Sequence, residues 1–201
     1  MKLAVTIAPA AGALPAVDYR WDADTDILTA GVLADHPDPE TEGGSGSVEI
    51  VGDDGSWLVL DVTAGRISGV EVAVWPPVRR LATLAPPAPV QDATAVVPSR
   101  AGGVAAVEVS TVLAADSDRA ERTIHFRIGP RRPARAVRIA RDLLLDVDER
   151  DRIAGVWLLN VPPAPAAAAD LSGAADRSGA ADPAGAAELP AHSPHPERLA
   201  P

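Results

Sequence analysis

The stretch Trp57-Leu-Val-Leu-Asp-Val62 recurs later in the chain as Asp142-Leu-Leu-Leu-Asp-Val147. Two further segments recur in the same order, namely Arg66-Ile-Ser-Gly-Val70 as Arg152-Ile-Ala-Gly-Val156, and Pro76-Pro77 as Pro162-Pro163. The offset is 85 residues up to Val62 and 86 from Arg66, so the second copy has one extra residue in the intervening turn. We interpret this pattern as an internal duplication, because ten identities in one order exceed what shared composition explains.

Each copy also has an upstream half. Val48-Glu-Ile50 corresponds to Val137-Arg-Ile139, and Asp22-Ala-Asp24 corresponds loosely to Asp116-Ser-Asp118. The sequence therefore predicts a first module at residues 1–77 (core 17–77), a Pro-rich linker at 78–103, a second module at 104–163, and a disordered Ala/Pro-rich tail at 164–201. The tail has almost no large apolar side chains, so it cannot bury enough surface to offset the entropy of ordering.

Each downstream half has the pattern of a β-hairpin. Leu58 to Val62 is an apolar run of strand length, and Val70, Val72 and Val74 alternate with other residues as in a half-buried strand. The segment Gly52-Asp-Asp-Gly55 predicts a tight turn before it.

Residues 134–152 alone would favour a helix, but the duplication predicts strands there too. We therefore expect an all-β protein in which two homologous modules pack together as a pseudo-dimer, since about 60 residues alone make a marginal core.

Composition excludes several classes of protein. There are no cysteines, so disulfides and thiolate chemistry are absent, and no apolar run approaches the roughly 20 residues of a membrane helix. The net charge of −10 argues against nucleic-acid binding by the whole chain. The run from Leu3 to Ile7 fits either an opening strand or a short signal peptide. The Arg, Ala, Pro and Gly bias is typical of a GC-rich bacterial genome, and we expect a cytoplasmic protein.

The first module resembles a family of short bacterial domains of unknown function. The residues that carry the resemblance are Trp21-Asp22, Asp26-Ile27-Leu28, Leu60-Asp61, Gly65-Arg66-Ile67 and Gly69-Val70-Glu71-Val72. In the second module Asp151 stands in place of the turn glycine and Trp157 in place of the glutamate. The resemblance implies a small β-rich domain, and it implies no activity, because none is assigned to the family.

Three aspartates suggest an enzymatic alternative. Asp61 and Asp146 occupy the same place in the two copies, so a small metal-dependent hydrolase could use them with Asp22 in a cleft between the modules. The simpler interpretation, which we prefer, is that each aspartate stabilises its own turn. The four histidines and the absence of cysteine do not make a zinc site, and we expect neither a metal nor a cofactor.

The most distinctive charged feature is an arginine cluster from Arg127 to Arg141, with no acidic residue before Asp142. Such a cluster could bind phosphate, another anion or a nucleic acid. The interpretation that we prefer is that it faces the acidic first module or forms a solvated strand edge. The candidate binding residues are Arg131, Arg132, Arg135, Arg138 and Arg141.

The sequence therefore predicts a non-enzymatic binding or regulatory accessory protein. A protein partner is compatible with this class, while the hydrolase and anion-binding alternatives remain open.

Overall fold

The computed structural model describes residues 3–33, 44–98 and 106–165 of the 201. Within these ranges the chain forms strands, turns and irregular segments, and no helix, so the predicted all-β fold is confirmed. In particular, the described residues contain no helix that could cross a bilayer. The predicted disordered tail lies outside the described residues apart from its first two positions.

Each predicted module contributes five strands that pair in the same order. The first module contains β2 (Ala16–Asp22), β3 (Ile27–Leu33), β4 (Gly46–Gly52), β5 (Trp57–Thr63) and β6 (Arg66–Val74), which pair as β2-β3-β6-β5-β4. The second contains β10 (Leu113–Asp118), β11 (Ile124–Ile128), β12 (Ala134–Ala140), β13 (Leu143–Asp148) and β14 (Ile153–Leu158), which pair as β10-β11-β14-β13-β12.

The two hairpins that carry the sequence repeat have the same register. Asp61 lies opposite Gly69 in β5–β6, and Asp146 lies opposite Gly155 in β13–β14. In both hairpins the pairing shifts directly after the aspartate. The helical composition of residues 134–152 is overridden, as predicted, because β12 and β13 pair across the sheet and bury most of their side chains there.

The upstream halves agree with the predicted alignment in one part and differ in the other. Val48 and Glu49 lie against β5 in the same register as Val137 and Arg138 against β13, and a bulge at Ile139 then shifts the second pairing. However, Asp118, and not Asp116, occupies the position of Asp22, because each ends the first strand of its module. The carboxylates of Asp22 and Asp118 then accept backbone N–H bonds in the following turn, which is the turn role predicted for Asp22.

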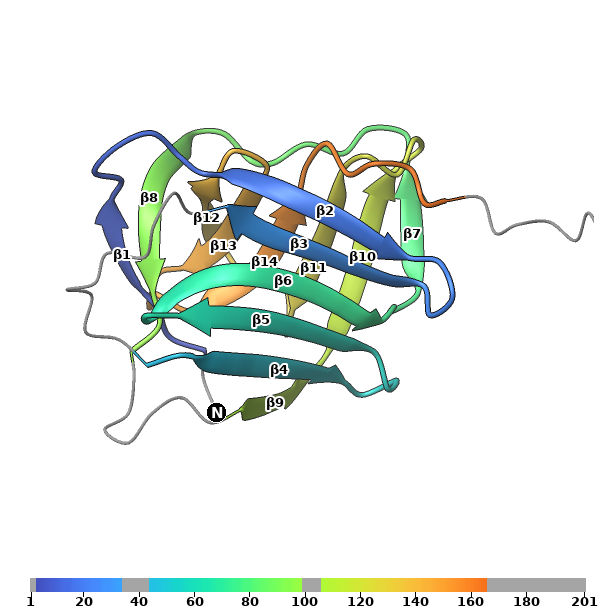
Figure 1. Ribbon diagram of the computed structural model, residues 1–201, viewed down its shortest axis with the longest axis horizontal. Helices are drawn as coiled ribbons and strands as arrows, with labels where there is room; N and C mark the ends of the chain where they lie inside the picture. Colours follow the sequence, from blue (N-terminus) through green and yellow to red (C-terminus); the bar gives the residue numbers. More distant parts are fainter. Residues whose placement is uncertain (1–2, 34–43, 99–105, 166–201) are drawn as a thin grey trace, which may run out of the picture. The chain divides into compact units, whose positions relative to one another are not determined.

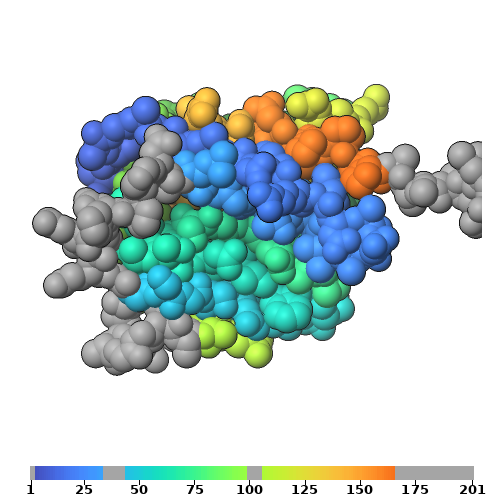
Figure 2. Space-filling model, viewed as in Figure 1, coloured from blue at the N-terminus to red at the C-terminus, as the bar shows by residue number. Residues whose placement is uncertain are grey.

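The two sheets lie face to face around one shared core (Figure 1). Figure 1 shows β2 to β6 in the nearer layer running across the strands of the farther layer. In Figure 2, residues of the first module, coloured blue to green, cover the viewed face. Alternate residues of both sheets fill the core, among them Leu60, Val72, Phe126, Leu145 and Val156, all at most 1% exposed. Burying each such side chain stabilises the fold by about 1.5–3 kcal/mol, which neither sheet could gain alone.

The segment predicted as a linker contributes two strands to the sheets. β7 (Val78–Leu81) pairs in parallel with β10, and β8 (Val90–Val96) pairs in parallel with β12 and antiparallel with β1 (Thr6–Pro9). Its prolines lie between β7 and β8 and after β8, where no ladder N–H is required. The proline positions therefore indicated where strands end, but they led to the prediction of a linker where β7 and β8 form.

Strands from outside each five-stranded unit complete its edge. β9 (Val107–Thr111), which the sequence assigned to the second module, pairs in parallel with β4 of the first. At the matching edge of the second module, β8 pairs in parallel with β12. The chain then passes from β9 directly into β10, so the two sheets are covalently linked at this corner.

Aromatic residues of the first module bind backbone atoms of the second. The Tyr19 hydroxyl donates to the carbonyl of Leu159 at 2.8 Å, and the Trp21 indole N–H donates to the carbonyl of Pro162 at 3.0 Å. Burial and the nearby Asp142 carboxylate raise the pKa of Tyr19 above its usual range. Trp21 also stacks on Trp75 with ring centroids 5.8 Å apart. These contacts hold β2 against the segment that follows β14.

Asp148 stabilises the β13–β14 turn. Its Oδ2 accepts hydrogen bonds from Arg132 Nε at 2.9 Å and Arg152 Nε at 2.8 Å, while its Oδ1 accepts the backbone N–H groups of Arg150 and Arg152. Burial alone would raise the pKa of this carboxyl, but the bonds from Arg152 and Arg150 outweigh it and hold the pKa well below its usual range. Asp148 thus performs the turn role that the sequence assigned to Asp146.

We expect Asp148→Asn to lower the free energy of unfolding by about 3 kcal/mol, because it leaves two half-buried guanidinium groups without their counter-charge. Urea denaturation followed by tryptophan fluorescence measures this loss. Asp151→Asn is the matched control, since the Asp151–Arg135 pair is exposed and its loss should cost less than about 1 kcal/mol. Equal losses in the two variants would contradict the assigned role.

The same carboxylate predicts the acid response. The depressed pKa means that the unfolded chain takes up the proton first, so Asp148 contributes stability above about pH 4 and loses it as the pH falls toward the folded pKa. The free energy of unfolding should therefore fall from about pH 5 to pH 2.5 more steeply in the parent protein than in Asp148→Asn. Parallel curves for the two proteins would contradict this prediction.

Candidate functional site

The outer face of the second sheet carries a row of chemically distinctive side chains. Directly paired residues form one line across seven strands, from β7 to β8: Arg79, Asp116, His125, Trp157, Leu144, Arg138 and Asp92. These positions alternate with the residues that fill the shared core, so the row faces away from the core. The candidate site lies in this row and in the row beside it.

His125 and Trp157 converge on the carboxylate of Asp146. The Nε2 atom of His125 lies 2.9 Å from Asp146 Oδ2, and the Trp157 indole N–H donates to Asp146 Oδ1 at 2.9 Å. The imidazole stacks on the indole with ring centroids 4.0 Å apart and planes 12° from parallel. Because an ionised carboxylate only accepts, His125 donates through Nε2, and its orientation is fixed by two contacts.

Gly155 provides the space for this contact. A methyl group at Gly155 would lie 2.7 Å from the Phe126 carbonyl oxygen, 2.8 Å from His125 Nε2 and 2.9 Å from Asp146 Oδ2. At the matching Gly69 of the first module, a methyl group would also lie 2.9 Å from Asp61 Oδ2, but the corresponding backbone contact, with the carbonyl of Ala30, is 3.5 Å. The glycine found in both copies therefore has a much tighter environment in the second.

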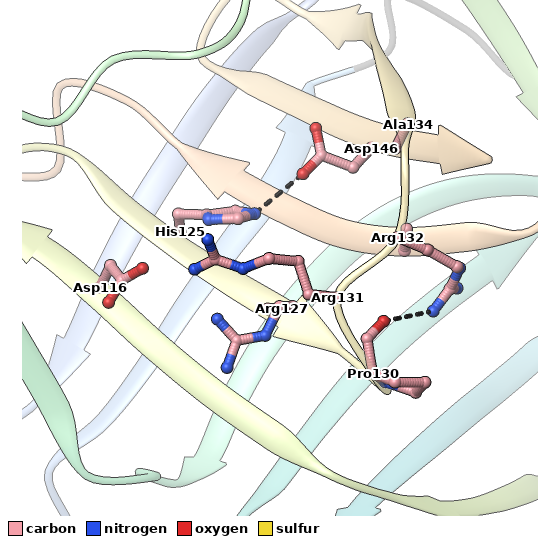
Figure 3. A pocket seen from close by; sticks show the side chains of 9 residues that line it. Asp116, His125, Arg127, Pro130, Arg131, Arg132, Ala134 and Asp146 are labelled. Carbon is pink, nitrogen blue, oxygen red and sulfur yellow. Dashed lines mark hydrogen bonds and ion pairs between the residues drawn. The ribbon is translucent and has the colours of Figure 1, made fainter.

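A cavity of about 130 Å³ opens beside His125 (Figure 3). We call it the anion pocket and define it by its lining residues: Asp116, His125, Arg127, Pro130, Arg131, Arg132, Ala134, Asp146 and Ala154. The sheet supplies its floor, and the loop between β11 and β12 supplies Pro130, Arg131 and Arg132. Figure 3 shows the Arg127 and Arg131 side chains extending toward the region between Asp116 and His125.

The charges of the pocket fall into two groups. Asp116 is bound by both Nε and Nη2 of Arg79, at 2.8 and 3.0 Å. Burial raises the pKa of Asp116, but the hydrogen bonds and charge of Arg79, with a smaller contribution from Arg127, lower it below its usual range. In contrast, neither Arg127 nor Arg131 forms an ion pair with a carboxylate of the described residues. These two guanidinium groups are thus available to a ligand.

The structure disperses the five arginines that the sequence offered as binding residues. Arg131 alone points into the pocket as a ligand-accessible group. Arg132 also lines the pocket, but its Nε binds Asp148, and its Nη1 and Nη2 bind the carbonyls of Ile128 and Ile153. Arg132 is therefore a structural residue.

The other three lie away from the pocket. Arg135 pairs with Asp151 at 2.9 Å, and Arg138 Nη1 lies 3.7 Å from Asp92. Arg141 is exposed at the β12–β13 turn. The arginines of the cluster that form ion pairs do so with Asp148 and Asp151 of the second module and Asp92 of β8. They therefore do not pair with the acidic residues of the first module.

The three aspartates of the hydrolase alternative do not meet. Asp61 and Asp146 project from the outer faces of different sheets, with the shared core between them, and Asp22 is exposed at a turn. Within the described part of the chain, no group of three His, Asp or Glu side chains could hold a metal ion. Asp146 also does not cap its turn, because β13 continues two residues farther and Asp148 binds the turn instead.

Sequence reasoning missed most of the pocket. The sequence did not predict that Asp116, His125 and Arg127 lie together, because their proximity depends on the register of β10, β11 and β14. One signal was present, namely the replacement of Glu71 by Trp157 between the two copies. At the other matching position Thr29 corresponds to His125, so the first module lacks both stacked rings.

A scan of protein-family models finds no match to this chain, and a search of curated proteins finds no similar sequence. The resemblance to bacterial domains of unknown function therefore stays a prediction, and the candidate function depends on the pocket itself.

We expect Gly155→Ala to lower the free energy of unfolding by about 3 kcal/mol, and Gly69→Ala to change it by less than about 1 kcal/mol. Both substitutions restrict the unfolded chain equally and crowd an aspartate Oδ2 at 2.9 Å, so the difference isolates crowding against the Phe126 carbonyl and His125 Nε2. Thermal and urea denaturation of the two variants measure it. Equal destabilisation would contradict the distinction between the two glycines.

Proposed function

We propose that this protein is a non-enzymatic binding protein that takes a small anion in the anion pocket. The observation that carries the proposal is the pair Arg127 and Arg131, whose guanidinium groups line one cavity with no carboxylate partner among the described residues. Guanidinium groups bind phosphate, sulfate and carboxylate oxygens through charge-assisted hydrogen bonds. The sequence predicted a binding or regulatory protein, with anion binding as one alternative, and the proposal combines these two predictions.

The size of the pocket supports a small ligand. Its volume of about 130 Å³ is well above the roughly 10–15 Å³ that a single water requires. Pockets for drug-sized molecules are larger, at about 300–1,000 Å³. A tetrahedral oxyanion fits this size, and a nucleotide base with its sugar does not.

The surroundings hold the pocket in a fixed geometry. Arg132 ties the β11–β12 loop to Asp148 and to the carbonyl of Ile153, and Trp157 holds the plane of the His125 ring. A loop that is bound at its centre loses little freedom when a ligand enters. This supports binding by a preformed site.

We also propose that the two modules are homologous repeats in a bacterial cytoplasmic protein. Matching strand order and the shared Asp–Gly register support the repeat. β1 and the buried side chain of Val5 support the interpretation of the first residues as part of the fold. The compositional bias supports the bacterial assignment.

We expect Arg127→Gln and Arg131→Gln each to weaken binding of inorganic phosphate or sulfate about tenfold, because each removes a charged donor from the pocket. Isothermal titration calorimetry of the full chain, at constant ionic strength, measures the affinity. Arg135→Gln is the matched control, since Arg135 pairs with Asp151 outside the pocket and its loss should leave the affinity unchanged.

Two results would overturn the proposed function. One is the absence of binding of either ion to the parent protein at millimolar concentration. The other is an equal loss of affinity in all three variants, which would indicate a general charge effect rather than the pocket.

A further inference from the structure

We propose that the anion pocket selects an oxyanion that carries a proton, namely hydrogen phosphate, over a fully deprotonated ion of the same shape such as sulfate. This inference rests on the proposed function and adds the chemical class of the ligand. It follows from the two hydrogen-bond acceptors that line the pocket beside the two arginines.

The first acceptor is the carboxylate of Asp116. Its side chain is 13% exposed and lines the pocket, and Figure 3 shows it directed toward His125 and Arg127. The bidentate contact with Arg79 keeps it ionised. An ionised carboxylate cannot donate a hydrogen bond, so an anion oxygen without a proton is repelled there.

The second acceptor is Nδ1 of His125. Asp146 lies beside Nε2, so the neutral form of the imidazole that donates to this carboxylate has its lone pair on Nδ1. Stacking on Trp157 prevents the ring from turning this lone pair away. Nδ1 forms no hydrogen bond with the described residues, and it is not among their fully buried polar atoms without a partner, so it is open to a ligand.

The arginines and the acceptors together define the ligand. Arg127 and Arg131 supply donors and two positive charges, which require anionic oxygens. Asp116 and His125 require at least one O–H donor. At about pH 8 inorganic phosphate carries both kinds of oxygen, whereas sulfate has no proton to give.

Sites that present fixed hydrogen-bonding groups reject ligands that lack the complementary group by large factors, up to about 10⁴–10⁵ when fully enclosed. The anion pocket is open on one side, so we expect a smaller preference. Phosphate should bind at least about tenfold more tightly than sulfate to the full chain at about pH 8 and equal ionic strength. Isothermal titration calorimetry with the two sodium salts measures the ratio.

Asp116→Asn is the diagnostic variant. It replaces a charged acceptor by a group that can also donate, so sulfate affinity should rise at least about tenfold and the preference for phosphate should disappear. Asp92→Asn is the matched control, because Asp92 also faces an arginine of the same row, Arg138, but lies outside the pocket. This control should keep the parent preference.

His125→Phe is the second variant, and it keeps an aromatic ring against Trp157 while removing the Nδ1 acceptor. It should reduce the phosphate preference even if Asp116→Asn fails to fold, as circular dichroism would show.

Equal affinities of the parent protein for phosphate and sulfate would overturn this inference and leave the proposed function standing. An unchanged preference in a folded Asp116→Asn variant would also overturn it. If the parent protein binds neither ion, the proposed function itself fails.

Discussion

The shared core between the two sheets is the constraint on which the rest of the structure depends. Because the inner faces meet, alternate positions on every central strand must be apolar, and the core includes Leu60, Val72, Phe126, Leu145 and Val156. Charged side chains on these strands are therefore forced to the two outer faces. Among the described residues, the inner faces are filled by core side chains and leave no cleft between the central strands, so the charged groups of these strands lie on the outer faces.

The Asp–Gly pair of each hairpin shows how the outer faces differ. Asp61 and Gly69 occupy the same register as Asp146 and Gly155, so the backbone places a carboxylate over a glycine in both modules. In the second module His125 and Trp157 enclose that carboxylate, and in the first the matching positions hold Thr29 and Glu71. These two replacements enclose the Asp146 carboxylate, and Arg127 and the β11–β12 loop supply further lining of the pocket beside it.

The sequence repeat was sufficient to predict the all-β class, the two hairpins and the strand character of residues 134–152, because identical residues at matching positions require the same pairing. It could not predict that β8 and β9 complete the edges, since parallel pairing leaves no local turn signal. The arginine cluster could be recognised directly in the sequence. Which arginines remain available depended on partners distant in sequence, such as Asp148 for Arg132 and Asp151 for Arg135.

The local charge of the pocket differs from the net charge of the chain. The chain carries a net charge of −10. Near the pocket, Asp116 is bound by Arg79, and Asp146 by His125 and the Trp157 indole. Arg127 and Arg131 form no ion pair with a carboxylate of the described residues. Over the few ångströms of a binding site, local charge and hydrogen-bond direction outweigh the screened charge of distant groups. Under the proposed function, donors and acceptors in one small cavity would specify both the charge and the protonation of the ligand, which an arginine cluster alone would not.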